Sequence, residues 1–139
     1  MMFQFPFINR EGPMSDLRKI LLVGYNFELP LTILGSNGFS EADGYQTVMV
    51  MTSRTALSML EQDHTIVGVI AADPRFQPHV ACSSKSQSQA LNAIPMIVLA
   101  HQTSLQNVVK VYKGPRTRIV LREEIGTLPA TLRELLAAA

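Results

Sequence analysis

The sequence predicts an α/β domain in which a five-stranded parallel sheet is covered by helices on both faces. Five short apolar runs recur along the chain, at residues 19–24, 46–52, 65–72, 95–100 and 117–121. The runs are continuously apolar rather than alternating, which is typical of parallel strands buried on both faces. Segments with helical features lie between them, and this alternation predicts one doubly wound sheet with right-handed crossovers.

The first two strands are expected at 19–24 and 46–52. The first reads "KILLVG", and the second reads "QTVMVMT", whose Val and Thr residues favour extended structure. The connection at 29–43 should hold a helix, but Pro30 and Gly35 weaken its pattern. We therefore expect a short or distorted helix that starts near Pro30.

The clearest helix is expected at 53–63, where Ser53 can cap the first turn and apolar residues recur at helical spacing. This helix leads into the third strand, at 65–72. The residues that follow have the composition of a loop, with the polar tract "SSKSQSQ" at 83–89. About 86–93 is then left for the third helix.

The rest of the chain provides two more strands and two more helices. A helix at 103–113, with Val109 among its apolar positions, lies between the strands at 95–100 and 117–121 and ends at a Gly-Pro pair. A last helix is expected at 128–139. The sequence thus predicts about five helices.

Length and composition indicate one ordinary globular domain. The chain has 139 residues, of which 47% are hydrophobic and 17% charged. No apolar run approaches the roughly 20 residues of a membrane helix, and the N-terminus does not have the pattern of a signal peptide. Cys82 is the single cysteine, so no internal disulfide can form. These features predict a cytoplasmic chain that does not contact a membrane.

We expect residues 1–16 to form an N-terminal tail and residues 17–139 to form the domain. The tail holds Phe3, Phe5 and Phe7 at the alternating spacing of a strand. Three aromatic side chains favour packing on the domain, on a second copy or on a partner. A flexible chain end is the competing interpretation, and both stay open.

Charge is distributed unevenly along the chain. The net charge is only +1. No Asp or Glu occurs from Pro74 through Arg122, whereas the basic residues there are Arg75, Lys85, Lys110, Lys113, Arg116, Arg118 and Arg122. The second half of the chain is therefore basic.

Four phrases carry a resemblance to a known family: "KILLVGYN", "GYQTVMVMTSRTALSMLEQ", "IPMIVLAH" and "IVLREE". Their order and spacing resemble the receiver domain of two-component response regulators. The resemblance extends from about Arg18 to the C-terminus. It implies a three-layer αβα flavodoxin-like fold, with the five strands in the order 2-1-3-4-5.

The resemblance also implies where a phosphorylation site would lie. A working receiver holds magnesium with two adjacent acids after strand one and accepts the phosphoryl group on an acid at the end of strand three. A Thr or Ser after strand four and a Lys after strand five stabilise that group. These positions, with the aromatic switch residue, fall here on Gly24 and Tyr25, Ile70, Ala100, Arg122 and Ile119. The match to Ile70 assumes that Pro74 is the proline of the family's loop.

Most of the chemistry of that site is missing from these positions. Neither Gly24 nor Tyr25 can bind a cation with its side chain, and Ala100 has no hydroxyl. Only the positive charge remains, at Arg122, and Arg is not equivalent to Lys at a compact phosphoryl site. The resemblance therefore implies a degenerate receiver, a pseudo-receiver, with no metal, no cofactor and no catalytic residue.

A pseudo-receiver would act by contact with a protein partner. The basic residues Lys110, Lys113, Arg116 and Arg118 fall on helix four, its exit loop and strand five. In receivers the helix 4–strand 5–helix 5 face contacts output domains or a second copy. We expect an acidic protein partner there. Nucleic acid is disfavoured because only Tyr112 accompanies the basic residues as an aromatic platform. Such a domain would be the regulatory part of a larger response regulator, transcription regulator or sensor kinase.

Two alternatives stay open. Asp73 follows the third strand directly, and a slipped alignment would make it a phosphoacceptor. A solvated loop acid that caps the turn before Pro74 is the competing interpretation. The second alternative is a small anion or nucleotide bound at the strand ends by Arg122, His101 and backbone amides.

Overall fold

The computed structural model describes residues 17–72, 84–111 and 116–138. These residues contain one sheet of five parallel strands in the order β3-β2-β4-β5-β6. The strands are β2 (Arg18–Val23), β3 (Tyr45–Val50), β4 (Ile66–Ala71), β5 (Met96–Ala100) and β6 (Thr117–Leu121). Numbered along the chain, this is the order 2-1-3-4-5, and the prediction is confirmed.

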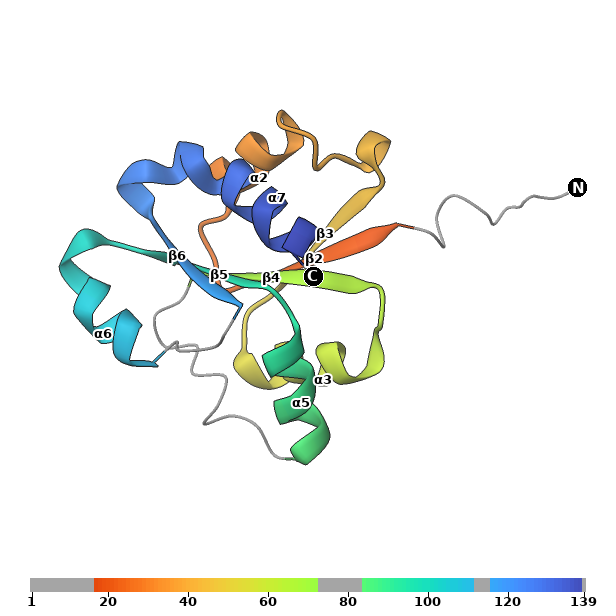
Figure 1. Cartoon of the computed structure of the whole chain (residues 1–139). Coiled ribbons are helices and arrows are strands. Elements are labelled where there is room, and N and C mark those ends of the chain that lie inside the picture. The colour runs from red at the N-terminus through yellow and green to blue at the C-terminus, as the bar shows by residue number, and fades with distance from the viewer. Residues whose placement is uncertain (1–16, 73–83, 112–115, 139) are drawn as a thin grey trace, which may run out of the picture.

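Five α-helices cover the sheet within these residues. They are α2 (Glu28–Gly35), α3 (Ser53–Gln62), α5 (Lys85–Ala93), α6 (Leu105–Val111) and α7 (Leu128–Ala138). Three 3₁₀ turns accompany them: η2 (Glu41–Asp43), η3 (Gln102–Ser104) and η4 (Arg122–Thr127). Figure 1 shows α2 and α7 on one face of the sheet and α3 and α5 on the other, which gives the expected three-layer αβα arrangement.

The central strands are buried on both faces because successive side chains point in opposite directions. Leu21 of β2 packs in the cluster that contains Leu57 of α3 and also includes residues of α5 and α6. Ile20 and Leu22 pack in the other cluster, with Leu128 and further residues of α2 and α7. Burial in this second cluster is complete for Ile20, Leu22 and Leu128. This is the reason that β2 reads as a continuous apolar run rather than an alternating one.

The connection at 29–43 is divided, as its weak helical pattern predicts. Helix α2 begins at Glu28, two residues before Pro30, and has only eight residues. Gly38 then adopts a positive φ of 97°, and η2 forms the last part of the connection. Proline is tolerated in a first helical turn because its missing N–H would have no partner there.

Two details of the other helices differ from the prediction. The cap of α3 is Thr52 rather than Ser53, because the Thr55 backbone N–H donates to the Thr52 hydroxyl oxygen at 3.2 Å. On α6, Val109 is 49% exposed, whereas its neighbour Val108 is buried. Helix α6 packs against β5 through Val108, so only one side of the helix faces the core.

Some predicted features lie outside the described residues. They are the tail at 1–16, most of the loop after β4, and the end of the helix predicted at 103–113. Within 17–72, 84–111 and 116–138, none of the helices has both the length and the apolar character needed to cross a lipid bilayer.

An ion pair joins the start of β2 to the end of α3. The Lys19 ammonium donates to an Asp63 carboxylate oxygen at 2.6 Å. The Thr65 hydroxyl and backbone N–H also donate to this carboxylate. The hydrogen bond from Lys19, followed by those from Thr65, lowers the pKa of Asp63 to about 2.

This pair predicts a specific loss of stability in acid. The unfolded chain titrates Asp63 near pH 3.9. Because the folded pKa is lower, the ionised carboxylate stabilises the fold above about pH 4, and this contribution is lost as the pH falls through about 2. The free energy of unfolding of Asp63→Asn should be lower by about 1 kcal/mol at neutral pH, since the pair is partly exposed. The difference should shrink between about pH 4 and 2 in urea titrations. An equal difference at both ends of that range would contradict the assignment.

Candidate functional site

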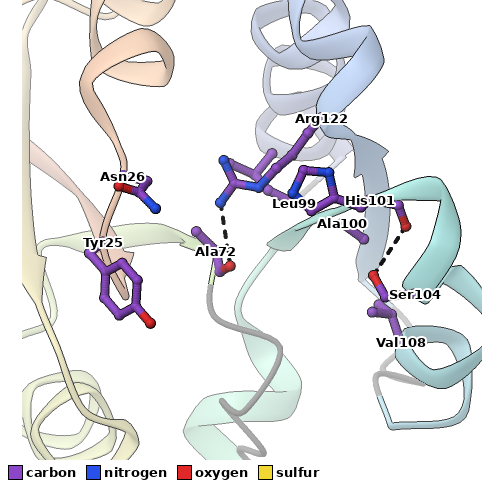
Figure 2. Close-up of a pocket in the computed structure, with 9 residues that line it drawn as sticks. All are labelled: Tyr25, Asn26, Ala72, Leu99, Ala100, His101, Ser104, Val108 and Arg122. Carbon is purple, nitrogen blue, oxygen red and sulfur yellow. Dashed lines mark hydrogen bonds between the residues drawn. The ribbon is translucent and has the colours of Figure 1, made fainter.

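A pocket opens at the carboxyl edge of the sheet, where four of the strands end (Figure 2). Its volume is about 270 Å³. The residues that line it are Tyr25, Asn26, Ala72, Leu99, Ala100, His101, Ser104, Val108 and Arg122. It spans the ends of β2 and β4, the neighbouring strands at which the strand order reverses. Ligands of open α/β sheets bind at this type of crevice.

Arg122 extends across the pocket. It follows β6 directly, and its Nη2 donates to the carbonyl oxygen of Ala72, just past β4, at 3.4 Å. Because β5 lies between β4 and β6, the side chain crosses the end of that strand (Figure 2). This hydrogen bond is longer than usual, so it holds the guanidinium in position only weakly.

The turn after β2 has an unusual backbone. Gly24 has a φ of 119° while its N–H donates to the Val50 carbonyl at 2.8 Å. Asn26 has a φ of 68°, in the left-handed region that Asn tolerates better than most residues. Tyr25 lies between them and is 50% exposed. A side chain at position 24 would be strained, because positive φ values are accessible mainly to glycine.

Comparisons with known proteins identify the fold. No protein-family model and no curated protein matches the chain. Among solved structures, the chain is similar to a response regulator receiver protein from Sinorhizobium medicae WSM419, with a TM-score of 0.61 and 20% identity over 89% of this chain and 98% of that one. It is also similar to the bacteriophytochrome response regulator RtBRR, with a TM-score of 0.60 and 21% identity over 86% of this chain and 78% of that one. The chain has a receiver-domain fold. At these identities the likeness concerns the fold alone.

Three of the positions implied by the receiver resemblance meet in the pocket. Tyr25, Ala100 and Arg122 all line it. Gly24 precedes Tyr25 and shapes the turn through its backbone rather than through a side chain. Ile119 packs instead against the core cluster that includes α3 and α5.

Ile70 does not line the pocket. It is fully buried inside β4, where it pairs with Leu22 and Ile97. At the end of this strand the pocket is lined by Ala72, two residues later. The match to Ile70 depends on Pro74, which lies outside the described residues, as does Asp73.

The described donor set of the pocket does not fit the magnesium ion that a working receiver holds. Magnesium binds through oxygens, usually from carboxylates. Of the described residues that line the pocket, none is Asp or Glu, and one is the cationic Arg122. No group of three His, Cys, Asp or Glu residues suited to a metal ion occurs in the described parts of the chain.

The basic residues predicted to bind a partner are only partly described. Arg118 is exposed on the edge strand β6. Arg116 is exposed just before β6, at the amino ends of the strands, whereas the pocket lies at their carboxyl ends. Its Nη1 donates to the Ala93 carbonyl at 3.0 Å. The Lys110 side chain and Lys113 lie outside the described residues. Partner binding by these four residues stays a prediction.

An apolar groove lies beside the pocket and was not predicted. Its volume is about 580 Å³, and it shares Tyr25 and Asn26 with the pocket. Met49 and Met51 line it and are 59% and 69% exposed. The sequence held a signal, since Met49 and Met51 alternate in "QTVMVMT" as on one face of a strand. Ser104 was also missed, because its place in the pocket depends on the turn η3.

The backbone at Gly24 leads to a test with a matched control. Gly24→Ala should lower the free energy of unfolding by on the order of 1–3 kcal/mol, because alanine is strained at this φ. Gly35 ends α2 at an ordinary φ with no atom within 4 Å of an added Cβ, so Gly35→Ala should be neutral or slightly stabilising. Denaturant unfolding of both variants measures the difference. Equal effects would show that the turn after β2 does not require glycine.

Proposed function

We propose that this chain is a signalling domain of the receiver fold that works by binding a protein partner, without phosphotransfer and without catalysis. The observation that carries the proposal is the composition of the strand-end pocket. Tyr25 and Ala100 stand where the receiver resemblance requires an acid and a hydroxyl, and Arg122 brings a guanidinium into the pocket. The proposal includes a cytoplasmic location and a role as the regulatory part of a larger protein.

Electrostatics supports this interpretation. A divalent cation beside the Arg122 guanidinium would be repelled, and the described lining residues offer no carboxylate to offset that repulsion. Gly24 adds a backbone obstacle, because an acid restored at this position would be strained. Losing several parts of one charge-dependent site favours a domain whose regulation comes from binding equilibria.

We propose the α6–β6–α7 face as the docking surface for the partner. Among its described residues, Arg118 is exposed on the edge strand β6, and Val109 of α6 is 49% exposed. Arginine beside exposed apolar surface is typical of protein interfaces. The partner is an acidic surface of an output domain, of another protein or of a second copy. Neither nucleic acid nor a membrane is proposed.

The position of Ala72 favours a second candidate function, phosphorylation of Asp73. Asp73 directly follows Ala72, whose carbonyl accepts the hydrogen bond from Arg122. The residue that precedes Asp73 in the sequence therefore lines the pocket. A phosphoacceptor at Asp73, with Arg122 beside the phosphoryl group, is the alternative.

Phosphorylation separates the two candidates. We expect incubation with acetyl phosphate and magnesium to leave the intact mass of the full chain unchanged, because the pocket does not fit the metal. A working receiver treated in the same way is the positive control. A gain of one phosphoryl group that Asp73→Asn abolishes would replace the main proposal with the alternative.

Self-association tests the version in which the partner is a second copy. Sedimentation of the full chain over a range of concentrations should then show dimers, and Arg118→Glu should weaken them by about tenfold or more through lost charge complementarity. Arg54→Glu makes the same charge change at an exposed position of α3, which is not part of the α6–β6–α7 face, and should leave dimers intact. A chain that stays monomeric excludes the second copy as the partner.

A further inference from the structure

The strand-end pocket contains a cation that docking on the α6–β6–α7 face does not use. Arg122 is partly buried, and its one hydrogen-bond partner among the described residues is the Ala72 carbonyl. A guanidinium has five N–H donors. Four donors therefore remain for another acceptor, beside a hollow in which none of the described lining residues is a carboxylate.

Polar side chains from three strand ends surround the hollow. Asn26, after β2, forms one wall, and Arg122 and His101, after β6 and β5, lie together on the other (Figure 2). The Ser104 hydroxyl donates to the His101 carbonyl at 3.1 Å and holds the start of η3 in place. A guanidinium, an imidazole and a side-chain amide are all able to donate hydrogen bonds to one oxyanion.

The floor of the pocket is apolar. Leu99, Ala100 and Val108 line it and are each buried. Low polarity beneath the site strengthens the attraction between Arg122 and an anion. The Glu123 side chain lies outside the lining residues, and its carboxylate accepts a hydrogen bond from the Gln102 backbone N–H at 3.4 Å.

Size restricts the ligand. At about 270 Å³ the pocket is slightly smaller than the roughly 300–1,000 Å³ of sites for drug-sized ligands. It suits one anionic group with a small body, and it is too small to enclose a dinucleotide.

We propose that this pocket binds a small oxyanion ligand, a phosphate ester or a carboxylate, held without a metal ion by Arg122 together with His101 and Asn26. The ligand binds as an intact molecule, and no covalent bond forms. The pocket adjoins the docking face, because Val108 belongs to α6 and Arg122 directly follows β6. Neither Val109 nor Arg118 lines the pocket, so the binding of an anion there does not depend on the function proposed above.

Nuclear magnetic resonance of the ¹⁵N-labelled full chain in EDTA tests the proposal. The probes are phenyl phosphate, benzoate and benzyl alcohol, which share a ring and differ in charge. We expect saturable shifts at Asn26, His101 and the Arg122 Nε for at least one anion and none for the alcohol. The anion that binds with the higher affinity identifies the class of oxyanion.

Two variants isolate the role of Arg122. Arg122→Gln should weaken the binding of that anion by at least about tenfold, because it removes a charge-assisted hydrogen bond. Arg54→Gln removes the same charge from an exposed position on α3 that does not line the pocket, and should leave the affinity within about twofold. If Arg122→Gln does not fold, Arg122→Lys keeps the charge without the planar fork and should weaken binding severalfold.

Absence of saturable binding by both anions would overturn the proposal, as would equal weakening by the variants at positions 122 and 54. The proposed function is tested separately, by whether acetyl phosphate and magnesium increase the mass of the chain. Failure of the proposed function therefore cannot be confused with failure of this site.

Discussion

Burial of β2, β4 and β5 between two layers of helices is the constraint on which the rest of the structure depends. Each of these strands must present apolar side chains to both faces, so the strands themselves have little room for polar chemistry. Polar side chains gather instead where the strands end. Because the strands are parallel, their ends meet at one edge, and Asn26, His101 and Arg122 come together there from distant parts of the sequence.

The described residues at that edge carry a charge opposite to that of a magnesium site. A metal site needs several oxygens directed at one point, whereas the described lining of this pocket has a guanidinium directed over an apolar floor. A positive charge at Arg122 repels a divalent cation and attracts an anion. The backbone contributes as well, because Gly24 has a conformation that suits glycine.

The edge strand β3 brings a second kind of surface to the same end of the sheet. This strand pairs only with β2, and its Met49 side chain remains exposed, as does Met51 just after the strand. Methionine side chains are flexible and adapt to varied partners. The carboxyl edge therefore combines an adaptable apolar groove with a cationic pocket, and Tyr25 is shared by both.

The sequence by itself determined the order of the elements, because a run such as "KILLVG" can satisfy both of its faces only inside a layered sheet. It also identified Tyr25, Ala100 and Arg122 as strand-end residues. Only the tertiary structure decided which of these side chains meet. Local patterns cannot show that Arg122 crosses β5 to reach Ala72, fifty positions away, or that Ile70 stays buried while Ala72 reaches the pocket. Such contacts depend on strand order and register, which arise from packing over the whole sheet.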